Sequence, residues 1–151
     1  MNRQNVRLKG DEMIFLKQSD YDEIVRYAEK NLPEESCGLL GGIADSDKFW
    51  VKKVYFLTNT DHNSEHFSMK PEEQFSAVRD MRKFGWKLLG NFHSHPLSPA
   101  HPSQEDKRLA FDPDVSYLIL SLAQKKPELK SFRIKEKTVH EEKVEILQEE
   151  S

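Results

Sequence analysis

Apolar and polar positions near the start of the chain alternate in a way that predicts a short strand followed by a helix. Residues 13–17, in which 13–16 are all apolar, predict a short strand. A helix is predicted to begin at Ser19, which forms a capping-box-like pair with Asp22, and to end at Pro33, because proline cannot continue a helix. The apolar positions of this segment fall on one helical face: Tyr21, Ile24, Val25, Ala28 and Leu32.

The middle of the chain predicts a hairpin, a polar loop and a second helix. Residues 37–43 and 49–57 are apolar stretches joined by the turn-like segment 44–47, which favours a β-hairpin. Residues 59–68 are polar and predict a loop. Pro71 suits the first position of a helix that ends near Gly85. The inward face of this helix is predicted to carry Phe75, Val78 and Met81.

The second half of the chain adds strands around a proline-rich loop. A strand is predicted over 86–92, a loop over 96–102, and a short helix from Ser103, acting as its cap, through Ala110. Residues 115–122 predict a central strand, and 131–137 and 139–147 predict two more. Together these elements predict a mixed α/β fold in one domain over 13–148, preceded by a polar and flexible segment, 1–12.

Composition and charge narrow the classes of protein that this chain can belong to. The 151 residues suffice for one core, and nine Phe, four Tyr and two Trp supply its bulk. The formal charge of −3 offers no electrostatic footprint for nucleic acid, and no apolar run approaches the length of a membrane-spanning helix. Cys37 is the only cysteine, and the N-terminal residues lack an apolar signal segment. We therefore expect a cytoplasmic protein without nucleic-acid or membrane partners.

One segment of the chain carries the pattern of a metal site. It reads His93-Ser94-His95-Pro96 and, after the proline-rich loop, Ser103-Gln104-Glu105-Asp106. Residues two apart on a strand point to the same side, so His93 and His95 can present both imidazoles to one point. A loop that folds back into a helix can add the Asp106 carboxylate. Three such ligands and a water are typical of catalytic zinc, although iron or manganese accept similar donors.

Other readings of these and neighbouring residues stay open. A His-x-His pair alone is more often a polar strand end than a ligand pair, and it is Ser103 and Asp106 that favour the metal site. His101, and the spaced pair His62 and His66, are further imidazoles, but His93, His95 and Asp106 already complete a three-ligand set. The thiol of Cys37 could be a ligand or a nucleophile, but a buried small residue is the simpler interpretation. The hydroxyl of Ser94 is best explained as a strand-end contact. The aromatic residues within 49–56 are best explained as core.

The spacing of these residues resembles the signature of the JAMM (MPN+) metalloprotease family. The segment Glu35-Ser36-Cys37-Gly38 resembles the family's Glu-x-Cys-Gly motif, and the strands before and after the histidines, 86–92 and 117–122, resemble those of the family. The resemblance implies the family's fold, a mixed sheet sandwiched by helices with cytidine-deaminase-like architecture. It also implies zinc ligands at His93, His95 and Asp106, a general acid/base at Glu35 rather than Glu34, and an intermediate-stabilising hydroxyl at Ser103.

By that resemblance the chain is a zinc-dependent peptidase or isopeptidase. The family cleaves at or after the C-terminal tail of ubiquitin-like proteins, and small prokaryotic members act on ubiquitin-fold sulfur carriers. Because no long insertion lies between His95 and Ser103 or directly after Asp106, a sulfur-carrier or small ubiquitin-like partner is preferred over polyubiquitin. The main alternative is a non-catalytic MPN-type scaffold or binding module. A zinc base deaminase is excluded because its signature needs a Cys pair.

Overall fold

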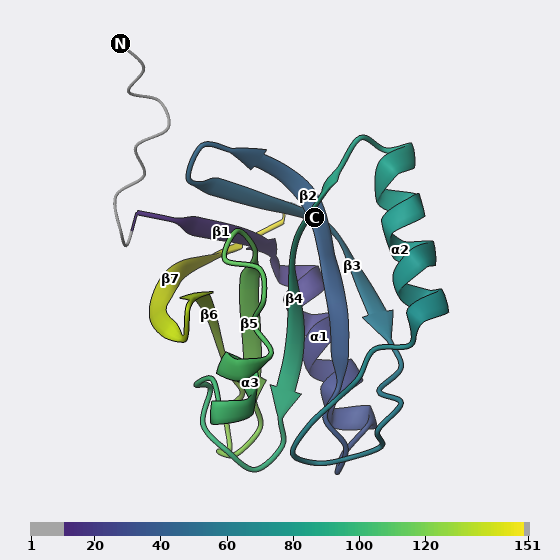
Figure 1. Cartoon of the computed structure of the whole chain (residues 1–151), viewed down its shortest axis with the longest axis vertical. Coiled ribbons are helices and arrows are strands. Elements are labelled where there is room, and N and C mark those ends of the chain that lie inside the picture. The colour runs from purple at the N-terminus through teal and green to yellow at the C-terminus, as the bar shows by residue number, and fades with distance from the viewer. Residues whose placement is uncertain (1–10, 150–151) are drawn as a thin grey trace.

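The structure is a computed structural model, and it describes residues 11–149, in which seven strands and three helices form one mixed α/β unit (Figure 1). The flexible segment predicted over 1–12 falls mostly outside the described residues. In chain order the elements are β1 (Met13–Lys17), α1 (Gln18–Lys30), β2 (Cys37–Asp45), β3 (Lys48–Leu57), α2 (Pro71–Lys83), β4 (Lys87–His95), α3 (Gln104–Arg108), β5 (Ser116–Ser121), β6 (Glu128–Lys135) and β7 (Thr138–Leu147).

The seven strands close into a barrel in the order β1-β3-β2-β4-β5-β6-β7. The predicted hairpin of β2 and β3 is present, and β4 lies antiparallel to β2 and parallel to β5. Strand β1 closes the barrel, because it pairs in parallel with both β3 and β7. This closure joins segments that are far apart in the chain, and the local pattern of apolar residues contains no sign of it.

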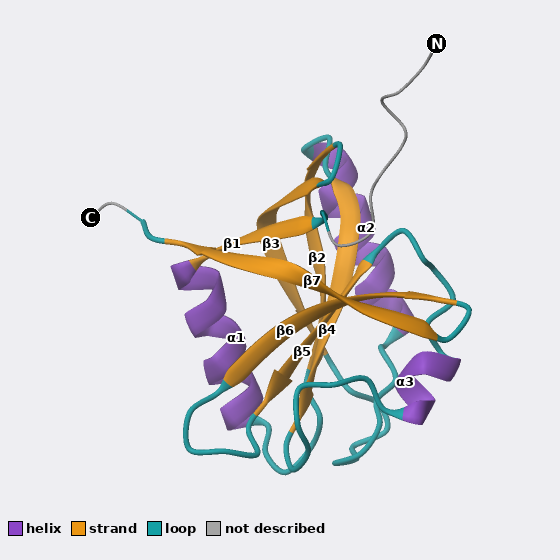
Figure 2. Ribbon diagram, turned by 90° about the vertical axis from the view of Figure 1, so that its left-hand side faces the viewer, coloured by secondary structure: helices purple, strands orange, loops and turns teal. Residues whose placement is uncertain are grey.

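Two helices cover opposite faces of β2, which confirms the prediction of a mixed sheet between helices. Leu40 of β2 belongs to a core that also holds Ile24 and Ala28 of α1. Cys37 and Leu39 point the other way, into a second cluster with residues of α2. A third cluster lies under the proline-rich loop. Figure 2 shows α1 and α3 on opposite sides of the strands. Phe92 of β4 packs in the core against α1, so the side chains of His93 and His95, which alternate with it, point away from α1.

Both longer helices differ in detail from the prediction. Helix α1 begins at Gln18 after an N-cap at Lys17 that makes no side-chain capping bond, so the capping box predicted at Ser19 is wrong. Instead, the Ser19 backbone N–H donates to the carboxylate of Glu149, at 2.9 Å. In α2 the inward residues are Ala77 and Met81, whereas Phe75 is 73% exposed. Residues 77 and 81 are one helical turn apart, and Phe75 lies on another face.

Two element boundaries in the second half also differ from the prediction. Helix α3 stops at Arg108, two residues short of Ala110. Strand β6 begins at Glu128 and ends at Lys135, because Glu136 and Lys137 have positive φ angles and form the turn into β7. The prediction had placed both turn residues in the strand. Within residues 11–149 no helix is long and apolar enough to cross a membrane.

A buried ion pair ties together β6 and β7 inside the barrel. Arg133 Nε donates to Glu142 at 3.0 Å, and the other carboxylate oxygen of Glu142 accepts from the Ser131 hydroxyl at 2.6 Å. The guanidinium lies 4.2 Å from the ring centre of Phe49 on β3. Because Arg133 and Glu142 are both almost completely buried, removal of one partner leaves an uncompensated charge in the core.

We expect Arg133→Met to lower the free energy of unfolding by about 3–5 kcal/mol, because Glu142 then stays buried without its cation. The matched control is Lys130→Met on the same hairpin, whose ion pair with Glu141 is exposed and 4.0 Å long. That change should cost less than about 1 kcal/mol. The double variant Arg133→Met/Glu142→Leu should recover most of the loss. Urea unfolding measures all three, and equal losses in Arg133→Met and Lys130→Met would contradict this account.

Candidate metal centre

The end of β4 presents two buried histidines to one point. His93 and His95 are 3% and 4% exposed, and they share a face because Ser94 between them points the opposite way. Ser94 is used for pairing instead: its backbone N–H donates to the carbonyl of Ser36 and its hydroxyl accepts from the Ser36 N–H at 2.7 Å. This agrees with the interpretation of Ser94 as a strand-end contact. The Nε2 atoms of the two histidines lie 3.1 Å apart.

Helix α3 supplies a carboxylate to the same point. Ser103 is its N-cap: the hydroxyl of Ser103 accepts from the Asp106 N–H at 3.0 Å, and Asp106 Oδ2 accepts from the Ser103 N–H at 2.9 Å. This reciprocal capping box holds the Asp106 side chain in one orientation. The same Oδ2 atom lies 3.2 Å from His93 Nε2 and 3.1 Å from His95 Nε2. The Asp106 carboxylate therefore belongs both to the capping box of α3 and to the cluster with the two histidines.

The separations within this cluster fit a tetrahedral metal. A tetrahedron's corners are about 1.63 times the bond length apart, so zinc with bonds of about 2.0–2.1 Å needs ligand atoms about 3.3–3.4 Å apart. The three observed separations are 3.1–3.2 Å. Among the His, Cys, Asp and Glu side chains of residues 11–149, those of His93, His95 and Asp106 have their ligand atoms close enough together to hold one metal ion.

The protonation of the cluster also suits a metal. His95 Nδ1 lies 2.8 Å from the carbonyl oxygen of Pro99, which can only accept, so Nδ1 carries a proton and Nε2 is the ring nitrogen directed at the cluster. Burial alone would raise the pKa of Asp106, but its contacts with His93, His95 and the Ser103 N–H hold the pKa far below the ordinary value. Asp106 is therefore an anion, as a metal ligand must be.

Glu35 lies two residues before β2, within electrostatic reach of His95 and Asp106. The Ser36 and Ser94 hydrogen bonds bring the start of β2 against the end of β4, and Cys37 stands in register with His93. The Glu35 side chain is 4% exposed, and its Oε1 is buried without a hydrogen-bond partner among the described residues. Burial raises the pKa of Glu35 from 4.5 to about 8, against the opposing effect of His95. A carboxyl with such a pKa can exchange protons near neutral pH.

Comparison with known proteins places the chain in a family. The model for prokaryotic homologs of the JAB domain matches residues 17–135, most of the chain. The chain belongs to this prokaryotic JAB family. The resemblance to JAMM (MPN+) proteins is thereby confirmed.

Relatives of this JAB protein include a CysO-cysteine peptidase and a desampylase. The CysO-cysteine peptidase of Mycobacterium tuberculosis is 29% identical over 143 residues, which cover 93% of this chain and 97% of the relative. A desampylase of Haloferax volcanii is 32% identical over 105 residues, 66% of this chain and 74% of the relative. Both alignments span the greater part of the relative's own length.

Solved structures agree with the JAB fold. A solution structure of a protein from Desulfitobacterium hafniense superimposes with a TM-score of 0.84 and 56% identity, covering 91% of this chain and 94% of the other. A crystal structure of a JAB1/MPN domain protein from Archaeoglobus fulgidus has a TM-score of 0.59 at 22% identity, covering 91% of this chain and all of the other chain. The second likeness concerns the fold alone.

The remaining candidate residues of the JAB domain lie outside the cluster. Glu34 is half-exposed and faces His62, with its carboxylate 3.3 Å from the imidazole. His66 pairs with Asp61, and His101 lies edge-on to Phe132. Cys37 is fully buried with its Sγ near the Leu57 carbonyl. Burial raises the pKa of the Cys37 thiol to about 12, so it stays protonated and is a poor nucleophile.

The polar loop after β3 contributes to the JAB site in a way that the sequence did not predict. Phe67 stacks on the imidazole of His93, with ring centres 4.8 Å apart. A pocket of about 390 Å³ opens beside His93 and Asp106, between this loop and the segment after α3. Its apolar lining includes Phe67 and Met69 of the loop, Leu109 and Phe111 after α3, and Ile134 of β6. In the sequence, the only indication of this side of the pocket is the presence of two apolar residues, Phe67 and Met69, in an otherwise polar segment.

The raised pKa of Glu35 predicts a pH-dependent stability of the metal-free JAB domain. The folded state retains the Glu35 proton up to about pH 8, whereas the unfolded chain releases it near pH 4.5. The stability that this neutral carboxyl contributes is complete below pH 4.5 and is lost as the pH rises toward 8. Glutamine at position 35 is neutral at every pH. In the presence of chelator, the Tm of Glu35→Gln minus the Tm of wild type should therefore be larger at pH 8 than at pH 5.

Differential scanning calorimetry with Glu34→Gln as the matched control measures this difference. Glu34 is half-exposed and its ion pair with His62 is exposed, so the Tm difference of Glu34→Gln should change much less over this pH range than that of Glu35→Gln. A Tm difference for Glu35→Gln that stays constant over the same pH range would show that the Glu35 carboxyl ionises normally.

Proposed function

We propose that this chain is a zinc-dependent peptidase or isopeptidase that hydrolyses the bond after the C-terminal Gly-Gly of a ubiquitin-like or sulfur-carrier protein. The observation that carries the proposal is the triangle of His93, His95 and Asp106 with the buried carboxyl of Glu35 across from it. The family relatives named as a CysO-cysteine peptidase and as desampylases support the reaction class. A cytoplasmic location, in keeping with the single cysteine, is part of the proposal.

His93, His95 and Asp106 would hold the zinc ion. Two imidazole nitrogens and one carboxylate oxygen are a donor set typical of catalytic zinc, which keeps one position open. When bound, zinc would polarise the scissile carbonyl and lower the pKa of a water molecule toward 7. The Pro99 carbonyl and the Ser103 N–H support this set, since they orient His95 and Asp106.

Glu35 would carry the proton between the attacking water and the leaving amine. As a carboxylate it accepts a proton from water, and as an acid it donates that proton to the departing nitrogen. The buried, unpartnered Oε1 atom leaves one carboxyl oxygen free for this task. The pKa near 8 that burial produces would fall beside a bound cation, toward the range in which both protonation states are accessible.

Ser103 would donate a hydrogen bond to the oxygen that gains negative charge. Its hydroxyl oxygen already accepts from the Asp106 N–H, so the hydroxyl proton remains for a substrate atom. Oriented donors of this kind stabilise charge as it develops on a carbonyl oxygen. The same serine therefore has two tasks, as helix cap and as donor.

The substrate tail would lie extended beside the pocket of about 390 Å³. His93 and His95 are buried and Phe67 covers one imidazole, so the floor next to the scissile bond has little space for side chains. Glycine has no Cβ and fits such a floor. Exposed apolar residues at the rim, of which Phe111 is 83% exposed, can contact the body of a small ubiquitin-like protein.

Purified protein should contain one zinc per chain, and His93→Ala should lose it. The control is His101→Ala, which removes an imidazole that lies outside the cluster and should retain zinc. Elemental analysis of the three proteins measures the content. Equal zinc in wild type and His93→Ala would overturn the ligand assignment, and a wild-type chain that rejects added zinc would point to a non-catalytic scaffold.

Glu35→Gln should retain zinc and lose hydrolysis by about 10²–10⁴, the usual range for removal of a general acid/base. Glu34→Gln, one position away and facing His62, should change the rate little. Zinc content and initial rates on a carrier with a C-terminal extension measure both properties. Reversed effects of the two substitutions would assign the base to Glu34.

Cleavage should occur directly after Gly-Gly and should fail after Ala-Ala. The test offers a small ubiquitin-fold sulfur carrier with an extension after Gly-Gly, together with its Ala-Ala variant. Mass spectrometry locates the cut. Equal rates on both carriers, or no zinc-dependent cleavage of either, would contradict the substrate assignment without affecting the metal site.

A further inference from the structure

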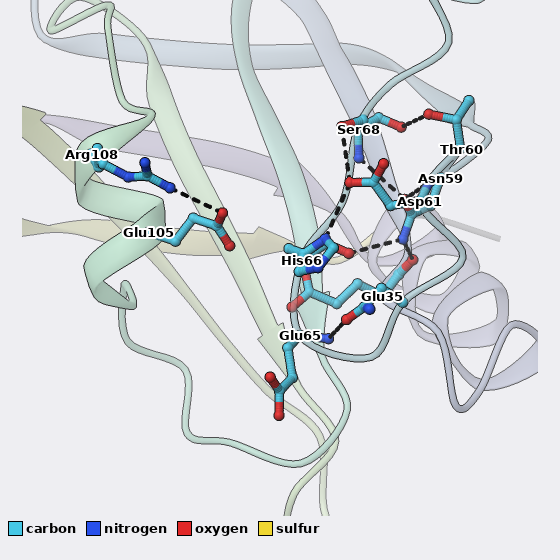
Figure 3. Close-up of polar contacts among 10 residues, drawn as sticks. Glu35, Asn59, Thr60, Asp61, Glu65, His66, Ser68, Glu105 and Arg108 are labelled. Atoms are coloured by element: carbon cyan, nitrogen blue, oxygen red, sulfur yellow. Dashed lines mark hydrogen bonds and ion pairs between the residues drawn. The ribbon is translucent and has the colours of Figure 1, made fainter.

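The loop after β3 folds back on itself beside Glu35, and Asn59 and Met69 close it. These two residues form an isolated antiparallel bridge, and the Thr60 N–H donates to the carbonyl of Ser68 at 2.9 Å. We name residues 59–69 the bridge loop. Figure 3 shows the polar side chains of the bridge loop around Glu35, with Glu105 and Arg108 of α3 farther away.

Asn59 lies at the centre of the bridge loop and uses its whole side-chain amide. Nδ2 donates to the carbonyls of Glu35, at 3.0 Å, and His66, at 3.2 Å. Oδ1 accepts from the N–H groups of Asp61, at 3.0 Å, and Ser68, at 3.1 Å. An asparagine amide offers two donor hydrogens and one oxygen with two lone pairs, and all of them are paired here. The residue is 6% exposed, so none of these bonds is exchanged for water at low cost.

The bridge loop holds the backbone of Glu35 from both ends. The Glu35 N–H donates to the Asn63 carbonyl at 2.7 Å, and the Glu35 carbonyl accepts from Asn59. Figure 3 shows the Glu35 side chain extending away from Asn59. The other carbonyl bound by Asn59 belongs to His66, directly before Phe67, which stacks on His93. One amide group thus connects the backbone of Glu35 to the ring that packs on the metal cluster.

We propose that Asn59 is a positioning residue for the reaction, which sets Glu35 and Phe67 at fixed places relative to His93. The proposal rests on the proposed function of Glu35. Its basis is that Glu35 lies outside any helix or strand, with the Ser36–Ser94 hydrogen bonds on one side and the bridge loop as its other support, while its own Oε1 is unpartnered. A shift of about 1 Å in a group that transfers a proton can reduce turnover roughly 100-fold.

The test is Asn59→Asp with Asn63→Asp as the matched control. Asn59→Asp keeps the oxygen that accepts from Asp61 and Ser68, but places a carboxylate against the carbonyls of Glu35 and His66. Asn63→Asp adds the same charge to the same loop and keeps the oxygen that accepts from the Glu65 N–H. Titratable groups around position 59 (Glu35, Asp61, His66 and Glu73) are common to both variants.

With zinc-loaded enzyme and a Gly-Gly carrier at pH 8, kcat of Asn59→Asp should be roughly 10–100-fold below that of Asn63→Asp, with equal zinc content and a similar KM. This ratio should narrow as the pH falls, because a protonated Asp at position 59 regains a donor. The proposal would be overturned if the two variants had nearly equal kcat values, or if kcat of Asn59→Asp were lower than that of Asn63→Asp by the same factor at every pH. If Asn59→Asp does not fold, Asn59→Ser, which keeps one hydroxyl donor without charge, should still show a lowered kcat with zinc retained.

A second readout does not depend on activity. In metal-free protein, hydrogen exchange of the Glu35 amide should be roughly tenfold faster in Asn59→Asp than in Asn63→Asp, with exchange inside β4 and β5 unchanged. Equal exchange of the Glu35 amide would overturn the positioning role. If wild type cleaves no carrier, the proposed function fails separately, and the exchange result alone decides whether Asn59 fixes Glu35.

Discussion

Hydrogen bonds between Ser36 and Ser94 join the residue directly before β2 to the end of β4. Glu35 precedes this contact in the chain, and His93 and His95 flank it on the other strand. Antiparallel pairing has a fixed register, so the contact sets which side chains face one another at the end of the sheet. The position of Glu35 relative to the two histidines therefore follows from strand pairing, with the bridge loop as its second support.

Helix α3 adds the third member of the cluster by a local device. Asp106 Oδ2 accepts from the Ser103 N–H and also faces both imidazoles. A short helix is only marginally stable alone, and the capping box both starts it and turns its carboxylate toward β4. The end of β4 and the start of α3 are separated in the sequence by little more than the loop over 96–102. This short loop is enough to bring the two histidines and Asp106 together.

The sequence allowed a correct prediction where structure follows from neighbouring residues. The hairpin of β2 and β3, the helix start at Pro71 and the convergence of His93, His95 and Asp106 all depend on spacing within short segments. Barrel closure through β1 could not be predicted, since its pairing with β3 and β7 joins distant segments. The exposure of Phe75 and the capping of α1 by Glu149 are also results of tertiary contacts, which hydrophobic pattern alone does not contain.

The surroundings of the candidate site were harder to predict than its ligands. Asn59 is one of many polar residues in a loop, and its burial depends on how that loop folds over Glu35. The buried pair of Arg133 and Glu142 likewise appears in the sequence as ordinary charges on two strands. Once buried, such polar and charged side chains need hydrogen-bond or ion-pair partners within the protein. Which of them are buried depends on the whole fold.

X-ray absorption spectroscopy at the zinc edge of the purified protein tests the central claim most directly, because it reports the atoms bound to the metal. The account predicts a shell of nitrogen and oxygen atoms at about 2.0–2.1 Å, with the multiple-scattering pattern of two imidazoles, and no sulfur neighbour. A sulfur shell at about 2.3 Å would place Cys37 on the metal and contradict the assignment of His93, His95 and Asp106.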